Sequence, residues 1–257
     1  MKKTLIYLTL LASLGFGASV GAETSTQASS ESHEAHWGYT DEISPDYWGS
    51  LSDDYQVCRD GQEQSPINIT NAQDVDLPAL ALNSKDSKVS VLNNGHTIQV
   101  TPQNNDNTLV IGDKTYTLKQ FHFHAPSENE IDGKQYPLEG HFVYKTEDGQ
   151  ITVVSVLYQY GKENTGLKAI WSKMPTKVDS EATVSSNIAI DKLFPTSQDY
   201  YNFEGSLTTP PCTEGVNWIV FKKQETISKA QVKKFSKVIG VKNNRPLQDV
   251  NGREIKD

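Results

Sequence analysis

Short hydrophobic runs recur along most of the chain and predict a protein built mainly of β-strands. The runs that alternate or are continuously apolar are residues 89–92, 97–100, 108–111, 115–124 and 151–158. Asn94-Gly95 lies between the first two runs, and this dipeptide is typical of a β-hairpin turn. Residues 151–158 are nearly all apolar, which predicts a central strand that is buried on both faces.

Helical periodicity is confined to two segments. Residues 165–174 follow Asn164, a residue type that caps helix N-termini, and residues 228–239 begin with a capping box formed by Ser228 and Gln231. Many strands with few helices predict a sheet-dominated α+β fold. The remaining segments, including a long stretch at residues 176–205, are expected to be loops.

The N-terminus is organised differently from the rest of the chain. Two lysines precede an apolar stretch at residues 5–20 that ends in small residues, which predicts a secretory signal peptide at residues 1–22. Residues 23–35 are polar and rich in Ser and Thr, and they are expected to form a disordered leader. Residues 36–257 show no internal repeat and are expected to form a single domain.

Charge and cysteine content narrow the functional classes. The formal net charge is −8, which argues against nucleic acid or an anionic membrane surface as a partner. No cysteine follows the signal closely, so no lipid anchor is expected on the mature protein. In an exported chain, the two cysteines, Cys58 and Cys212, are expected to form one disulfide.

Three histidines carry the candidate chemistry. His122 and His124 lie two residues apart on one predicted strand, and His141 lies on the next. Residues two apart in a strand share a face, so the three imidazoles converge if the two strands pair with these faces together. Three imidazoles with no fourth protein ligand are typical of a catalytic zinc site, which keeps one position open.

The neighbours of these histidines favour a metal site over isolated, hydrogen-bonded histidines. Gln120 lies two residues before His122, and Glu139 lies two residues before His141. By the same periodicity each shares a face with its histidine, and a metal-bound histidine usually donates its second ring N–H to such an oxygen.

Across nearly the whole mature region, the chain resembles the α-class carbonic anhydrases, and in particular the exported bacterial members, because its motifs occur in the family's order. The motifs are His36-Trp37-Gly38-Tyr39, Gln64-Ser65-Pro66-Ile67, Asn93-Asn94-Gly95-His96, residues 120–124, Glu139-Gly140-His141, residues 206–211 and Asn244-Arg245-Pro246. The resemblance implies a central, mostly antiparallel, twisted sheet of about ten strands with Zn²⁺ in a conical cleft. It also implies cis peptide bonds at Ser65-Pro66 and Pro210-Pro211.

The resemblance assigns a role to each candidate residue. It implies that His122, His124 and His141 bind zinc, that Gln120 and Glu139 orient these ligands, and that Thr208 and Glu128 form a hydrogen-bond relay at the metal. It implies that His96 shuttles protons and that Tyr39, Asn94 and Gln99 hold the water chain leading to it. The carbon dioxide pocket would be lined by Val143, Val153, Leu207 and Trp218 and bordered by Thr209.

The implied activity is the reversible hydration of carbon dioxide to bicarbonate and a proton, through attack by zinc-bound hydroxide. Three positions depart from the family pattern: Tyr144 and Asn129 stand where many relatives have histidine, and Ser155 where glycine is common. None of them is an assigned ligand or relay residue.

Two other functions fit the sequence less well. A zinc hydrolase of esters or peptides is disfavoured because the chain has no His-Glu-x-x-His motif. A catalytically inactive zinc-binding module of the same fold usually lacks a ligand, and here all three are present. The resemblance suggests a homodimer, and the sequence leaves open whether the exported protein is periplasmic or secreted.

Overall fold

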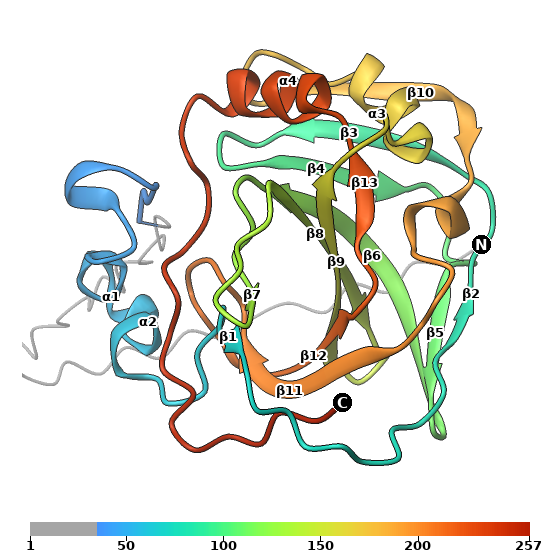
Figure 1. Cartoon of the computed structure of the whole chain (residues 1–257). Coiled ribbons are helices and arrows are strands. Elements are labelled where there is room, and N and C mark those ends of the chain that lie inside the picture. The colour runs from blue at the N-terminus through green and yellow to red at the C-terminus, as the bar shows by residue number, and fades with distance from the viewer. Residues whose placement is uncertain (1–34) are drawn as a thin grey trace, which may run out of the picture. The chain divides into compact units, whose positions relative to one another are not determined.

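A twisted sheet of eleven strands forms the framework of the protein (Figure 1). Its strands are β2 (Ala81–Asn83), β3 (Ser87–Asn93), β4 (Ile98–Pro102), β5 (Thr108–Ile111), β6 (Lys114–His124), β8 (Leu138–Lys145), β9 (Ile151–Tyr160), β10 (Ser180–Ile188), β11 (Tyr200–Ser206), β12 (Glu214–Phe221) and β13 (Glu225–Ile227). The main order is β10-β3-β4-β6-β8-β9-β12-β11. Within residues 35–257, the only parallel pairings of this sheet are those of β9 with β12 and with β13. The predicted sheet-dominated fold is confirmed.

Small elements complete the architecture. Strands β1 (Asn68–Ile69) and β7 (Glu130–Ile131) form a separate parallel pair. The helices are α1 (Trp48–Leu51), α2 (Val57–Asp60), α3 (Thr165–Ser172) and α4 (Lys229–Ile239), with 3-10 turns at Asp41–Ile43, Asp53–Tyr55 and Ile190–Leu193. No helix in this part of the chain is long and apolar enough to cross a membrane.

This computed structural model describes residues 35–257, which form one compact unit. The predicted signal peptide at residues 1–22 lies outside the described residues, as does all but the last residue of the predicted leader at 23–35.

Both predicted helices begin at their predicted caps. The Asn164 side chain accepts a hydrogen bond from the Leu167 N–H at the start of α3. Ser228 and Gln231 form the capping box of α4, which ends at Gly240 with a φ of 84°. Glycine adopts this left-handed conformation without the steric penalty of a Cβ, so it terminates the helix.

The two faces of the sheet have different roles. Phe121 and Phe123 of β6 point into the main core, where the Phe123 ring contacts Trp171 of α3 and Phe235 of α4. Figure 1 shows these two helices together beside β3 and β10. The alternation of side chains along β6 then places its histidines on the opposite face, as predicted. The helical layer therefore holds the strand that carries the histidines.

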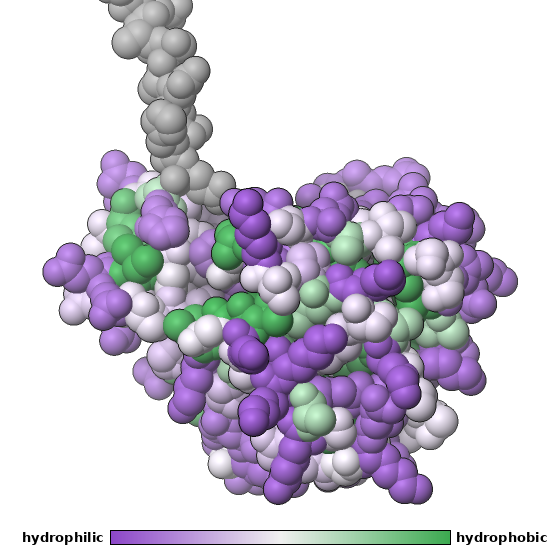
Figure 2. Space-filling model, turned by 90° about the horizontal axis from the view of Figure 1, so that it is seen from above, coloured by the Kyte–Doolittle hydropathy of each residue, from purple (hydrophilic) through white to green (hydrophobic). Residues whose placement is uncertain are grey.

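The molecular surface is consistent with the acidic, polar composition of the chain. Figure 2 shows the face that carries α3, α4 and β10, where hydrophobic residues occur in limited groups among hydrophilic ones. Scattered apolar groups of this kind are normal on a protein surface.

One local prediction was wrong, and one needs a change of detail. The stretch at residues 176–205 is not one long loop, because it contains β10 and the start of β11. Strand β10 escaped prediction because only Val184 and Ile188 of its nine residues are buried, so it lacks a hydrophobic alternation. The β3–β4 hairpin is confirmed, but its loop has four residues, since Asn93 pairs directly with Ile98.

The peptide bonds at Ser65-Pro66 and Pro210-Pro211 are cis, as the resemblance implied. Ala125-Pro126 is also cis, which was not predicted.

Candidate metal centre and cleft

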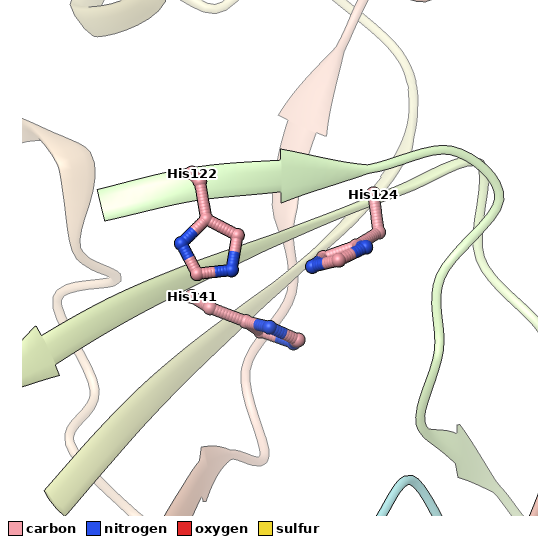
Figure 3. A group of neighbouring side chains, drawn as sticks. All are labelled: His122, His124 and His141. Carbon is pink, nitrogen blue, oxygen red and sulfur yellow. The ribbon is translucent and has the colours of Figure 1, made fainter. Parts of the chain in front are cut away.

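Three imidazoles converge on the face of β6 and β8 that lies opposite the main core. His122 and His141 are direct partners in the antiparallel register, and His124 lies two residues further along β6. Figure 3 shows the three rings turned toward one another from these two strands. One nitrogen from each ring lies within 4.8 Å of the others, a spacing that could hold one metal ion. The convergence predicted from strand periodicity is confirmed.

Each ring has one nitrogen engaged by a protein oxygen. His122 Nδ1 lies 2.8 Å from Gln120 Oε1, and His124 Nδ1 lies 2.7 Å from the carbonyl oxygen of Asn243. His141 Nε2 lies 3.0 Å from Glu139 Oε1, a close contact without the alignment of a full hydrogen bond. These contacts leave His122 Nε2, His124 Nε2 and His141 Nδ1 as the three donor atoms for a metal.

The donor set fits a divalent zinc ion. Burial, followed by the charges of His124 and His141, lowers the pKa of His122 well below its ordinary value, and burial lowers the pKa of His124. These two imidazoles are therefore neutral at neutral pH and offer lone pairs. His124 Nε2 is buried with no hydrogen-bond partner, and such an orphaned atom is explained by a metal ligand bond. The three imidazoles constitute a zinc-site triad.

Glu139, behind His141, is the most heavily hydrogen-bonded carboxylate of the site. Its Oε2 accepts from the backbone N–H of Glu128 (2.7 Å) and of Asn129 (2.8 Å). Its Oε1 accepts from Asn129 Nδ2 (2.8 Å) and Ser155 Oγ (2.6 Å). Burial alone would raise the pKa of Glu139, but His141 and these donors bring it to about 2. Two of the departures from the family pattern, Asn129 and Ser155, thus contact the same carboxylate.

Glu128 is equally buried but has fewer donors. Its Oε1 accepts from the Arg245 backbone N–H at 2.8 Å and lies 3.4 Å from His124 Nδ1. Burial raises the pKa of Glu128 to about 7, although His141 and hydrogen bonds from Thr208 and Arg245 oppose this rise. The Thr208 side chain therefore lies near Glu128, whose Oε2 has no hydrogen-bond partner among the described residues.

A cleft of about 300 Å³ opens over the triad. It is lined by His122 and His141, by the predicted residues Gln120, Val143, Val153, Leu207, Thr208, Thr209 and Trp218, and by Lys119, Lys145 and Ile151. The Trp218 ring packs edge-on against His141, with ring centroids 4.9 Å apart. The structure thus brings all five predicted pocket residues to the metal centre, with three further residues that were not predicted.

The predicted proton-path residues lie to one side of this cleft. His96 is half-buried and stacks on Trp37, with ring centroids 3.7 Å apart. The Tyr39 ring packs against Trp37 and Trp48. Asn94 Oδ1 accepts from the backbone N–H groups of His96 and Thr97, so this side chain shapes the turn that presents His96.

Gln99, the remaining proton-path candidate, is half-buried on β4. Its Nε2 donates to Thr101 Oγ1 at 3.5 Å.

Burial, with a smaller contribution from the Glu128 charge, raises the pKa of Tyr39, so its hydroxyl stays protonated. None of Tyr39, Asn94, His96 and Gln99 is among the described residues that line the cleft over the triad.

Asn243, which the sequence did not single out, connects the metal centre to the rim. Its carbonyl oxygen accepts from His124, and its Oδ1 accepts from the Ala125 N–H at 2.9 Å. Its Nδ2 donates to the carbonyl oxygens of His96 (3.0 Å) and Phe123 (2.9 Å). One fully buried asparagine therefore fixes a triad histidine and the backbone of His96 together.

The predicted disulfide joins Cys58 and Cys212, which are 154 positions apart. The Cys212 N–H donates to the Thr209 carbonyl oxygen, so the disulfide is attached to the loop that carries Thr208. On the other side, Arg245 Nη2 donates to the Cys58 carbonyl oxygen at 2.8 Å. Disulfides persist in oxidising compartments, so this bond indicates an extracytoplasmic protein.

Comparisons with known proteins agree with this geometry. Residues 43–257 match the family described as eukaryotic-type carbonic anhydrase. A carbonic anhydrase of Pectobacterium carotovorum is 48% identical over 228 residues, covering 89% of this chain and 93% of that protein. One from Neisseria gonorrhoeae is 47% identical over 232 residues, covering 90% and 92%.

A solved structure shows the same fold. The α-carbonic anhydrase of Thermovibrio ammonificans, in complex with the inhibitor sulfanilamide, superposes with a TM-score of 0.85 at 44% identity, covering 87% of this chain and all of that one. With its triad, its sheet and the match over residues 43–257, the chain belongs to the α-class, or eukaryotic-type, carbonic anhydrase family.

Proposed function

We propose that this protein catalyses the reversible hydration of carbon dioxide at the His122, His124 and His141 triad. The observation that carries the proposal is that each imidazole has one nitrogen engaged by a protein oxygen and the other free toward a common point. Zn²⁺ bound there would make a water molecule acidic enough to ionise near neutral pH, a property for which carbonic anhydrases are the standard example.

The ligand-orienting residues keep the imidazoles in the required state. A carbonyl oxygen can only accept a hydrogen bond, so Asn243 keeps the proton of His124 on Nδ1 and leaves Nε2 free. Gln120 does the same for His122 through its amide oxygen. Glu139, with its pKa held at about 2, remains an acceptor beside His141 Nε2 throughout the neutral range.

Thr208 and Glu128 form the proposed relay. An ionised Glu128 can only accept, so Thr208 donates its hydroxyl proton to Glu128 and turns its oxygen lone pairs toward the cleft. Thr208 then accepts from a group in the cleft that carries a proton. The relay thereby orients a protonated oxygen and disfavours anions that only accept hydrogen bonds.

The apolar wall of the cleft fits carbon dioxide. Val143, Val153, Leu207 and Trp218 present hydrocarbon and aromatic surface beside the triad, and Thr209 borders it. Carbon dioxide is small and apolar, so it is held there by contact area, without the desolvation cost that an ion would meet.

Proton transfer to solvent is assigned to His96, with Tyr39, Asn94 and Gln99 supporting the water chain. Histidine is the side chain that most readily exchanges protons near neutral pH. His96 is half-buried at the rim, and its backbone is tied to Asn243, which also holds His124. This linkage ties the backbone of the proposed shuttle to a residue that also holds one of the triad histidines.

We further propose that the protein is exported to the periplasm or the medium. The predicted signal sequence and the Cys58–Cys212 bond support export. Fractionation of the native host with antibody detection tests the compartment, and sedimentation velocity on the mature protein tests the predicted homodimer.

Alanine substitutions separate these roles. His122→Ala, His124→Ala and His141→Ala should each abolish hydration and lower bound zinc, because two histidines cannot hold the metal. His96→Ala should keep zinc and kcat/KM but lower kcat in dilute buffer, and added imidazole should restore the rate. Full hydration activity in a triad variant would contradict the site, whereas normal kcat in His96→Ala would contradict only the shuttle.

A further inference from the structure

Two lysines line the outer part of the cleft over the triad. Lys119 on β6 and Lys145 on β8 share this cleft with His122 and His141. The described lining residues include no carboxylate, so these ammonium groups are the only permanently charged side chains that line it. The whole protein carries a net charge of −8, so the cleft mouth has the opposite sign to the molecule around it.

A β-bulge turns Lys119 toward the cleft. Leu118 pairs with Tyr144 and Gln120 pairs with Val143, so Lys119 is an extra residue between two consecutive pairs. In a regular strand Lys119 would share the core face with Phe121. The bulge interrupts this alternation and lets Lys119 line the same cleft as Gln120.

Lys145 reaches the same cleft by regular alternation. Val143 and Lys145 lie two and four residues after His141, so all three share one face of β8. The Lys145 side chain runs close to Gly149, where a Cβ would lie 3.7 Å from Lys145 Cε. Neither Lys119 nor Lys145 forms an ion pair with any described carboxylate within 4.0 Å. Both charges are therefore available to a ligand.

We propose that Lys119 and Lys145 form a subsite for carboxylate-type anions at the mouth of the cleft, bicarbonate included. The inference rests on the proposed zinc site, because the ligand's other end lies at the triad. Four residues of strand place the Cα of Lys145 about 13 Å from that of His141, and a lysine side chain spans part of this distance. A ligand that binds at the triad and carries a carboxylate on the far side of one aromatic ring would bring that carboxylate within reach of the lysine side chains.

The physical basis is electrostatic focusing. Like charges placed together in a cleft with apolar walls raise the local concentration of oppositely charged ligands, and salt screens the effect. Carbon dioxide is neutral and gains nothing from the two lysines. Bicarbonate carries a negative charge, so its occupancy of the cleft depends on them.

Two probes of nearly the same size and shape, one charged and one neutral, test the subsite on the zinc-loaded protein. Sulfanilamide inhibits a solved relative, so 4-sulfamoylbenzoate and the uncharged 4-sulfamoylbenzamide serve as matched ligands. Dissociation constants are measured by calorimetry for the wild type and for Lys119→Gln/Lys145→Gln. Lys233→Gln/Lys237→Gln is the control, since it removes the same charge from the exposed side of α4.

The preference for benzoate over benzamide should fall about threefold to tenfold in Lys119→Gln/Lys145→Gln, which is the range for two exposed ion pairs. It should remain unchanged in the control and decrease with added salt in the wild type. An equal preference in all three proteins would overturn the subsite while leaving the proposed function intact. If neither probe binds the wild type, the proposed zinc site fails, and the subsite with it.

Competition by bicarbonate against the benzamide probe distinguishes the source of the anion. Weaker competition in the cleft variant than in the control identifies free bicarbonate as an occupant. Equal competition in both, together with a reduced benzoate preference, assigns the subsite to carboxylates tethered to a larger ligand.

Discussion

Two buried carboxylates lie behind the metal centre, and their surroundings give them opposite properties. Glu139 accepts four hydrogen bonds and has its pKa lowered to about 2. Glu128 accepts from the Arg245 N–H and lies near the Thr208 hydroxyl, and its pKa is raised to about 7. Both are essentially inaccessible to solvent, so the number of donors around each carboxylate decides its state. Glu139 is a permanent anion that orients the metal ligand His141. Glu128 lies beside Thr208, on the side of the site where the reaction is proposed to take place, which we call the reacting side.

The surroundings of the two carboxylates are also built differently. Glu139 is held by Asn129, which precedes β7, and by Ser155 of β9. Glu128 is held by Arg245, whose guanidinium donates to Gln64 Oε1 and to the carbonyl oxygens of Ser65 and Cys58. The Glu128 side therefore connects through Arg245 to Cys58 of the disulfide. The Glu139 side connects to the N-terminal part of the domain only through Asn129, whose Oδ1 accepts from the Ile67 N–H at 3.1 Å, and none of its described hydrogen bonds involves either cysteine.

The largest expected effect comes from removing the disulfide. Cys58→Ser with Cys212→Ser should destabilise the protein by up to about 4 kcal/mol, which corresponds to a fall in Tm on the order of 10 °C. Hydration activity should also fall, because the Thr208 loop and Arg245 are hydrogen-bonded to the two segments that the disulfide joins. Zinc dissociation should stay unchanged if the Glu139 side is independent. Calorimetry, hydration assays and chelator kinetics on the same variant check all three.

Thr208→Ala tests the reacting side directly. It removes the hydroxyl of the proposed relay but little packing, so kcat/KM for hydration should fall about 100-fold while Tm and zinc content stay close to the wild type. Formate should inhibit this variant more strongly, since the filter against pure acceptors is lost. Unchanged formate inhibition would count against the relay.

Glu139→Gln tests the orienting side. Loss of the anion beside His141 should raise the zinc dissociation rate about 10- to 100-fold. The zinc-loaded variant should keep most of its kcat/KM, because the relay is untouched. Zinc release to a chromogenic chelator measures the rate. A variant that releases zinc at the wild-type rate but has lost activity would reverse the roles assigned to the two carboxylates.

In the metal-free protein, Glu139 and Glu128 should change the folding stability in opposite directions as the pH rises. The folded pKa of Glu139 lies below its ordinary 4.5, so its contribution to stability is present above pH 4.5 and is lost as the pH falls toward 2. The folded pKa of Glu128 is raised to about 7, so its ionisation opposes folding as the pH rises from 4.5 to 7. Each group changes stability by at most about 1.4 kcal/mol per pH unit.

Urea unfolding of the chelated protein as a function of pH measures both contributions. Glu139→Gln should reduce the loss of unfolding free energy below pH 4.5. Glu128→Gln should reduce the loss of unfolding free energy between pH 4.5 and 7. Identical profiles for the two variants would show that the carboxylates do not differ.

The smallest expected effect is that of Ser155→Ala. It removes one of the four donors to Glu139 and should raise the zinc dissociation rate about threefold, less than Glu139→Gln. Ser155→Thr should restore the wild-type rate if the added methyl group is accommodated. Ser90→Ala, on β3, is the control and should leave zinc release unchanged.

Sequence periodicity predicted the metal centre because the triad depends on local alternation. His122 and His124 share a face of any regular strand, and Gln120 precedes them with the same parity. The register that pairs His122 with His141 follows from placing both polar faces together. The helix caps were predictable for the same reason, since a cap depends on residues within one turn.

Features set by tertiary contacts were not predictable in this way. Asn243 fixes His124 through a backbone carbonyl, which any residue type could supply. The bulge at Lys119 carries no marker such as glycine, and its effect appears only in the register with β8. Strand β10 is polar along most of its length, so its pairing with β3 could be seen only in the fold.

Zinc content measured together with hydration activity tests the central claim most directly. Mature wild-type protein, purified without added metal, is assayed for bound zinc and for carbon dioxide hydration before chelation, after chelation and after zinc is restored. The triad predicts one zinc per chain, loss of activity in proportion to zinc removed, and recovery on zinc addition. Hydration that persists in the fully zinc-depleted protein would contradict it.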